Sequence, residues 1–192
     1  MGTTRRNKKD DLIAAAVRLV ADHGAEAATI RAIAREAGVT DAAVYRHYEN
    51  KEDLWRRAYD RIIEEMVREK RPLVASDTPL REKLREWVRL SYAYYDRNPQ
   101  AVSFVLAMPI VAYKSGRSSV IGQGELFLEM IERAQQAGET REIPPEVALS
   151  HVVGMLLNVP RLINEGTLAG PASGYADEVA AAAWRVLRPE RA

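Results

Sequence analysis

Apolar residues recur every three to four positions along most of the chain, and this period constrains the fold more than any other feature of the sequence. Leu12, Ile13, Ala16, Val17 and Val20 form one such stripe. Residues at this spacing share one face of an α-helix. We find no convincing stretch in which apolar and polar residues alternate, which is the pattern of a half-buried strand. The sequence therefore predicts an all-α fold.

Glycine and threonine divide the N-terminal part of the chain into short helices. Gly24 is expected to end the first helix, because glycine readily adopts the left-handed conformation that closes helices. Thr29 caps a short second helix, which Gly38 ends. Thr40 then caps a third helix over Asp41–Tyr48. Two short capped helices joined by a glycine turn are typical of a helix-turn-helix.

The helices that follow are longer. Asn50 is expected to cap the fourth helix, with Asp53 at the capping-box position, and Arg71-Pro72 to close it. Pro160 interrupts a later helical stretch, where a kink or a split is expected. The expected C-terminal helices are Leu80–Arg97, Pro99–Met108, Ile121–Ala137, Pro145–Gly166 and Gly174–Leu187.

The third helix has one face suited to reading DNA. Val44 and Tyr48 are four residues apart, which predicts that they point to the core. An arginine on the opposite face can bond guanine O6 and N7, and a small apolar residue can touch a thymine methyl group. The residues expected on or beside that face are Ala42, Ala43, Tyr45 and Arg46.

Composition limits the other possibilities. The chain has no cysteine, so disulfides, thiol nucleophiles and cysteine-ligated metals are excluded. Its 28 basic and 27 acidic residues nearly balance, so any basic surface for DNA must be local. The first nine residues form a candidate basic arm with Arg5, Arg6, Lys8 and Lys9. We recognise no apolar stretch of about 18 residues, and therefore expect a soluble, cytoplasmic protein that is not bound to a membrane.

The order and spacing of these pieces resemble the DNA-binding domain of the TetR family of transcriptional regulators. The resemblance runs from Leu12 to Leu54 and rests on Gly24, on the segments TIRAIAREAGVT and VYRHY, and on NKEDL at the start of the fourth helix. It implies a DNA-binding domain over residues 1–54 and an effector-binding, dimer-forming domain over residues 55–192. It also implies a ligand-responsive regulator, expected to be a repressor released from a palindromic operator by a small apolar or aromatic effector. No metal or cofactor is expected.

The resemblance further implies two sets of contacts to double-stranded DNA. Bases are expected to be reached by Arg31 and by the face from Asp41 to Arg46, which includes Ala42 and Ala43. Asp41 repels phosphate but can accept a hydrogen bond from cytosine N4. The phosphate contacts are expected at Thr29, Thr40, Tyr45, His47 and Lys51. Each threonine is equally well explained as a helix cap alone. For His47, the alternative to a phosphate contact is a buried histidine.

In the C-terminal domain the resemblance implies a homodimer in which the last two helices of each chain form a four-helix bundle. Small residues would allow the helices to approach closely, although ordinary packing within one chain is the alternative. These residues are Ala148, Ser150 and Gly154 on one helix and Ala176, Ala180 and Ala183 on the other.

The resemblance also implies an effector pocket among the helices of residues 80–166, although each of its candidate residues is also a plausible core residue. His151 and Asn158 are seven residues apart on one helix, so they share a face and are expected to anchor polar groups. The apolar and aromatic candidates are Trp87, Tyr92, Tyr95, Phe104, Met108, Phe127, Met130 and Met155.

Two other classes of function remain open. An enzyme would need catalytic groups, but no known catalytic arrangement or metal-ligand spacing is present. The candidate groups are Glu64, Glu65, His151 with Asn158, and the cluster of Tyr92, Tyr94 and Tyr95. The other alternative is an all-α small-molecule-binding protein or enzyme whose helix-turn-helix serves as a protein-docking module.

Overall fold

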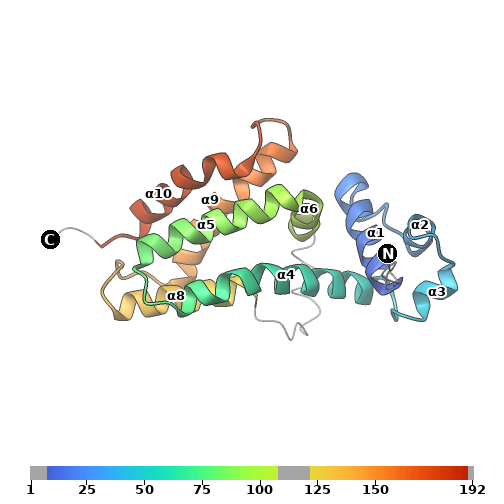
Figure 1. The fold of residues 1–192 in the computed structure, drawn as a ribbon, viewed down its shortest axis with the longest axis horizontal. Helices are drawn as coiled ribbons and strands as arrows, with labels where there is room; N and C mark the ends of the chain where they lie inside the picture. Colours follow the sequence, from blue (N-terminus) through green and yellow to red (C-terminus); the bar gives the residue numbers. More distant parts are fainter. Residues whose placement is uncertain (1–7, 108–121, 190–192) are drawn as a thin grey trace, which may run out of the picture. The chain divides into compact units, whose positions relative to one another are not determined.

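The computed structural model describes residues 8–107 and 122–189, and every regular element among them is a helix (Figure 1). The predicted all-α fold is confirmed. By their contacts, the residues group into two compact units. Among the described residues, unit 1 comprises residues 8–63 and 99–107, and unit 2 comprises residues 64–98 and 122–189.

Unit 1 is built around the first helix of the chain. α1 packs against α2 and α6, and α2 packs against α3. The buried side chains include Leu12, Val20, Ile33, Val44 and Leu54, which follow the apolar stripes of the sequence. The helices of this unit are α1 (Lys8–His23), α2 (Ile30–Glu36), α3 (Asp41–Tyr45), the first half of α4 (Lys51–Ala75) and α6 (Pro99–Ala107).

The predicted helix caps are present. Thr29 Oγ1 accepts a hydrogen bond from the N–H of Ala32 at 3.1 Å, and Thr40 Oγ1 accepts one from the N–H of Ala43 at 3.3 Å. Gly38 has a φ of +67°, which supplies the left-handed turn between α2 and α3. α3 is shorter than expected because its regular helix ends at Tyr45 rather than Tyr48.

α4 does not end at Arg71-Pro72. It continues through Pro72 to Ala75, so the predicted boundary is wrong. Proline in a helix removes one N–H donor and crowds the preceding turn. Here it lies in the last turn of a 25-residue helix, where little of the hydrogen-bond ladder remains to be lost. α4 therefore contributes its first half to unit 1 and its second half to unit 2.

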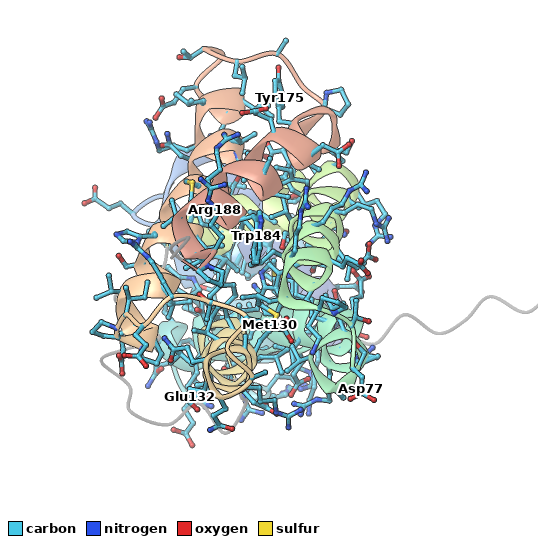
Figure 2. The ribbon with its side chains drawn as sticks, turned by 90° about the vertical axis from the view of Figure 1, so that its left-hand side faces the viewer. Asp77, Met130, Glu132, Tyr175, Trp184 and Arg188 are labelled. Carbon is cyan, nitrogen blue, oxygen red and sulfur yellow. The ribbon has the colours of Figure 1, made fainter. Side chains whose placement is uncertain are left out.

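Unit 2 is a bundle around α5. α10 and the short 3-10 helix η1 pack on α5, and α8 packs against α9. Trp87 of α5 meets Phe127 of α8 edge to face, with ring centroids 5.4 Å apart. In Figure 2, Met130 lies among the surrounding side chains, whereas Glu132 on the same helix points outward. The remaining elements are α5 (Leu80–Arg97), α8 (Gln123–Gln136), α9 (Pro145–Asn164), η1 (Ala172–Tyr175) and α10 (Ala176–Leu187).

α9 differs from the sequence prediction in two ways. It is not split at Pro160, which lies near the end of the helix and is buried. By length and composition it is also apolar enough to cross a membrane, so the sequence reading that found no such stretch is wrong. That reading overlooked the 20 residues of Pro145–Asn164, in which only Glu146 and Arg161 are charged.

The turn between α2 and α3 generates a stability prediction. Gly38→Ala is expected to lower the free energy of unfolding by about 1–2 kcal/mol, because an L-residue is strained at this positive φ. No atom lies within 4 Å of the added Cβ, so the cost comes from the backbone alone. Chemical denaturation measures it.

Gly124→Ala is the matched control. Gly124 lies inside α8, and its new Cβ would be an ordinary 3.7 Å from Leu149. This substitution is expected to stabilise the protein by up to about 1 kcal/mol. An unchanged free energy of unfolding in Gly38→Ala would contradict the role of the left-handed turn.

Candidate nucleic-acid interface

The structure exposes most of the residues predicted to contact DNA. Tyr45 is 57% exposed, an unusual position for a large aromatic residue. Val44 and Tyr48, at 0% and 3%, are buried as the helical period predicted. Ala43, His47 and Lys51 are partly exposed. The exposed residues are Thr29, Arg31, Thr40, Asp41, Ala42, Tyr45 and Arg46.

These exposed residues come from α2, α3 and the turns before them. α3 begins directly after the capped Thr40 and carries Tyr45 in its last turn, with Arg46 at the following C-cap. Among the described contacts, no hydrogen bond or ion pair holds the Arg46 side chain, so its five donors are available. This surface presents the Arg46 guanidinium, the Tyr45 phenol and the hydroxyls of two exposed threonines.

Lys51 is more deeply engaged than the sequence suggested. Its ammonium donates a hydrogen bond to the carbonyl of Ala25 at 3.1 Å and lies 4.2 Å from the centroid of the Trp55 ring. An ammonium has three N–H donors, so two remain for a phosphate. Lys51 therefore also ties the α1–α2 turn to the start of α4.

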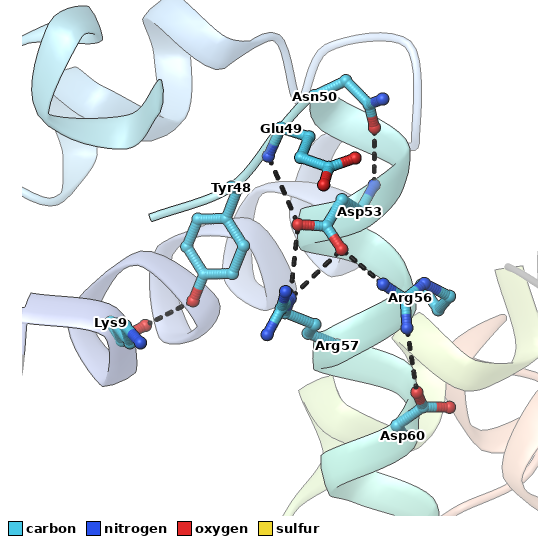
Figure 3. Close-up of polar contacts among 8 residues, drawn as sticks. All are labelled: Lys9, Tyr48, Glu49, Asn50, Asp53, Arg56, Arg57 and Asp60. Carbon is cyan, nitrogen blue, oxygen red and sulfur yellow. Dashed lines mark hydrogen bonds and ion pairs between the residues drawn. The ribbon is translucent and has the colours of Figure 1, made fainter. Parts of the chain in front are cut away.

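Asp53 is the centre of a polar network at the start of α4 (Figure 3). Its N–H donates to Asn50 Oδ1 at 2.8 Å, and its carboxylate accepts from the N–H of Glu49 at 3.3 Å. Arg57 Nε donates to the same carboxylate at 3.1 Å, and Arg56 forms a second ion pair with it. The predicted cap is thus present, but the carboxylate reaches Glu49, one residue earlier than a regular capping box.

The environment of Asp53 favours its charged form. Burial alone would raise the pKa of the carboxyl group. The hydrogen bonds from Arg57 and the Glu49 N–H, with the positive charges of Arg57 and Arg56, outweigh burial and hold the pKa below its usual value. The turn between α3 and α4 is therefore fixed by an ionised, largely buried carboxylate.

Tyr48 connects the same turn to α1. Its hydroxyl donates to the carbonyl of Lys9 at 3.1 Å, and the Arg57 guanidinium lies 5.9 Å from its ring centroid (Figure 3). Burial raises the pKa of Tyr48, and the charge of Arg57 partly opposes that shift. A second link joins Asp10 of α1 to Arg61 of α4. Sequence analysis missed both links, because partners 39 and 51 residues apart leave no local signal.

The predicted effector residues do not form one group. Trp87, Phe127 and Met130 are buried in unit 2, and the Tyr95 hydroxyl is bonded to Asn164 at 2.7 Å. Tyr92 is fully buried, and its hydroxyl has no partner among the described residues. The others are placed as follows: Phe104 is buried in α6 of unit 1, Met155 is partly exposed, His151 and Asn158 are exposed on α9, and Met108 lies outside the described residues.

A family comparison matches this interface. Residues 12–58, which contain α1, α2, α3 and the start of α4, match the family described as bacterial regulatory proteins, tetR family. The chain carries the DNA-binding domain of the TetR family of transcriptional regulators. It is therefore a DNA-binding regulator rather than an enzyme.

Similar proteins include a transcriptional repressor and a nucleoid occlusion factor. The HTH-type transcriptional repressor KstR2 of Rhodococcus jostii is 28% identical over 99 residues, 52% of this chain. The match spans about half of that repressor, 48% of its length. The nucleoid occlusion factor SlmA of Aliivibrio fischeri is 23% identical over 164 residues, 81% of this chain and 84% of that protein.

Solved structures of similar fold cover nearly all of the chain. The fatty acid degradation regulator FadR from Bacillus halodurans has a TM-score of 0.79 and 22% identity, and covers 94% of this chain and 96% of its own. FadR from Bacillus subtilis, solved in complex with stearoyl-CoA, has a TM-score of 0.78 and 15% identity, and covers 91% of this chain and 96% of its own. At these identities the likeness shows the TetR-like fold.

The network around Asp53 generates a prediction. Asp53→Asn is expected to lower the free energy of unfolding at pH 7 by about 1–2 kcal/mol, because it removes charge-assisted hydrogen bonds from a buried site. The pKa of Asp53 is depressed in the folded state, so its contribution is present above the unfolded value of 3.8 and is lost as the pH falls through the lower folded value. The difference between the two proteins should shrink towards pH 3.

Denaturant titrations at pH 7 and pH 3 measure this difference. Glu86→Gln is the control, since Glu86 forms an exposed pair with Arg89 within α5 and should change stability by less than about 0.5 kcal/mol. An equal loss for Asp53→Asn at both pH values would contradict the proposed charge network.

Proposed function

We propose that this regulator is a cytoplasmic homodimer that binds a palindromic operator and acts as a repressor, and that a small apolar effector releases it. The proposal that the protein binds DNA rests on one observation: Tyr45 and Arg46 are exposed at the end of α3, a helix that is rigidly anchored. α3 places Arg46 to read a guanine, while Thr29, Thr40, Tyr45, His47 and Lys51 hold the flanking phosphates. Arg31, Asp41, Ala42 and Ala43 complete the base-facing surface.

The dimer is supported by the outer face of α9. Only 22% of its most apolar 18-residue stretch is buried within the protomer. The buried positions Ala148, Val152, Leu156 and Pro160 recur every four residues and therefore share one face. The opposite face leaves apolar surface such as Val147, which is 40% exposed, without a cover in the described chain. A second copy of the chain would cover it.

The small residues predicted at the dimer interface divide between two roles. Ala148, Ala176, Ala180 and Ala183 are buried within the protomer, where they allow close packing inside unit 2. Ser150 and Gly154 are exposed on the outer face of α9 and remain available to a partner. His151 and Asn158 share this outer face, and Asn158 accepts a hydrogen bond from Arg161 at 2.9 Å. We therefore propose the dimer surface, rather than the effector pocket, as their place.

An apolar effector is supported by the composition of unit 2 and by one structural neighbour. Trp87, Phe127 and Met130 form an aromatic and thioether cluster in the core, and the similar FadR from Bacillus subtilis was solved with stearoyl-CoA. α4 is the element through which an effector can act, because it is one continuous helix shared by both units. A coupling of about 1–3 kcal/mol would weaken operator binding about 5- to 150-fold.

The test of the DNA-binding proposal is selection of fragments from a random DNA pool, followed by affinity measurement. Arg46→Ala is expected to cost about 1–3 kcal/mol on the selected site and to relax the base preference at one position. Lys51→Ala is expected to weaken specific and random DNA alike and to lower the salt slope by about one. The thermal stability of Lys51→Ala is measured in parallel, since Lys51 also bonds Ala25.

Arg89→Ala is the control for loss of an arginine, because Arg89 is on α5 of unit 2 and pairs with Glu86. It should leave DNA affinity unchanged. If Arg46→Ala loses equal affinity for selected and random DNA, Arg46 contacts phosphate and does not read a base.

The dimer generates a separate prediction. Gly154→Arg is expected to convert the dimer to a monomer, because α9 helices that approach at Gly154 have no room for a long side chain. Within the protomer, no atom lies within 4 Å of a Cβ added at Gly154, so the fold should tolerate the substitution. Sedimentation velocity at micromolar concentration measures the state. Gln136→Arg, at an exposed position on α8, is the control, and a Gly154→Arg protein that remains dimeric would refute this interface.

A further inference from the structure

Unit 2 contains a buried lysine that the fold does not neutralise. Lys70 on α4 is 1% exposed. Its Nζ donates to Gln123 Oε1 of α8 and lies 5.1 Å from the centroid of the Trp87 ring on α5. The amide of Gln123 is itself held by Met66, since Nε2 lies 3.3 Å from the methionine sulfur. The lysine therefore ends in a site made of one neutral amide, one aromatic ring and one thioether.

This site has unused donor capacity. An ammonium has three N–H donors, and Gln123 is the one hydrogen-bond acceptor that Lys70 has among the described residues. The neighbouring carboxylate, Glu69, is exposed and forms an ion pair with Arg97 at 2.9 Å. A buried charge without a counter-ion is costly, so such groups are normally paired.

The other buried lysine of unit 2 shows the contrast. Lys83 is 9% exposed and donates to the carbonyl of Val74, next to the C-terminal end of α4. That carbonyl lies in the last turn of α4, where a cation is favoured by the helix dipole. Lys83 thus has a local structural role, whereas Lys70 has none that its contacts explain.

We propose that Lys70 is the anion-recognition residue of the effector site, and that the effector carries an anionic oxygen group at one end of an apolar chain. The anionic group pairs with the Lys70 ammonium in place of Gln123, which is partly exposed and can swing away. The apolar chain packs beside Trp87, which adjoins the lysine, and Phe127, whose ring meets that of Trp87. This inference rests on the proposed effector-responsive function.

The electrostatics of the site support this assignment. Burial lowers the pKa of Lys70 from 10.5 to about 7, and the charge of Glu69 offsets this only in part. Among the described residues, α5 faces the ammonium with Trp87 and α8 with Gln123, both uncharged. Binding of an anion favours the charged amine, so a proton is taken up with the effector above about pH 7.

The test compares three probes that share a ten-carbon chain: decanoate, decyl phosphate and decan-1-ol. Binding is followed by titration calorimetry, and release is followed on the selected operator DNA. The wild-type protein should bind at least one anion more tightly than the alcohol. Lys70→Met should weaken that anion about 10- to 100-fold and leave the alcohol nearly unchanged, while Lys70→Arg should retain part of the affinity. Whichever of the two anions binds more tightly shows whether the site prefers a carboxylate or a phosphate head group.

Lys83→Met is the matched control for loss of a buried lysine and should leave the order of the three affinities unchanged. The pH provides a second readout. For the wild type, affinity for decanoate should fall by up to about tenfold per pH unit above about pH 7, and Lys70→Met should abolish this dependence. Without a probe, Lys70→Met should melt no lower than the wild type at pH 6.5, because it removes a buried charge.

Three results would overturn the inference, and they are distinguishable. If a decyl anion binds and releases the operator equally well in the wild type and in Lys70→Met, Lys70 is not the anion site, although effector-responsive regulation stands. If none of the three probes binds or releases operator DNA, both the anion site and the proposed class of effector fail. A Lys70→Met protein that melts far below the wild type would show that Lys70 is structural.

Discussion

The buried carboxylate of Asp53 holds the DNA-facing surface to the rest of the chain. α3 is only five residues long and cannot hold a fixed direction by its own hydrogen bonds. Asp53 fixes the turn that follows it by accepting from the Glu49 N–H and pairing with Arg56 and Arg57. Tyr48, which lies in that turn, is bonded to α1. The exposed Arg46 is therefore held on a rigid frame, which the proposed reading of a base by this side chain would require.

The two units use their polar residues in different ways. In unit 1, the buried Asp53 is fully paired and strengthens the fold. In unit 2, Lys70 and Tyr92 keep buried polar groups with unused hydrogen-bonding capacity. Unsatisfied buried groups cost stability and are uncommon in native proteins. The buried polar group of unit 1 thus stabilises one structure, whereas those of unit 2 keep hydrogen-bonding capacity that a bound ligand could use.

α4 gives these two parts a common element. Its first turn carries Lys51 and Asp53. Its second half carries Lys70 and Val74, whose carbonyl accepts the hydrogen bond from Lys83. The effector proposed to bind at Lys70 would therefore contact the same helix whose first turn fixes the turn after α3. Such a link is effective only if the effector has different affinities for the two states that it connects.

The sequence by itself determined the helices, their caps and the face of α3. Gly38, Thr29 and Thr40 act through neighbours three or four residues away, and Val44 and Tyr48 are buried by the same short period. The ends of α4 and α9 were harder to predict. Pro72 and Pro160 were expected to break helices, but each lies close enough to a C-terminal end to be accommodated.

Only the tertiary structure decided which long-range partners meet. The bond from Tyr48 to Lys9 and the site formed by Lys70, Trp87 and Gln123 join residues from different helices. Periodicity states that a residue faces inward or outward, but not which helix it faces. For this reason the alanines of α10 were expected at a dimer interface and are found inside the protomer. Local hydrogen bonds are determined by residues that are close in the sequence, whereas packing depends on how whole helices fit together.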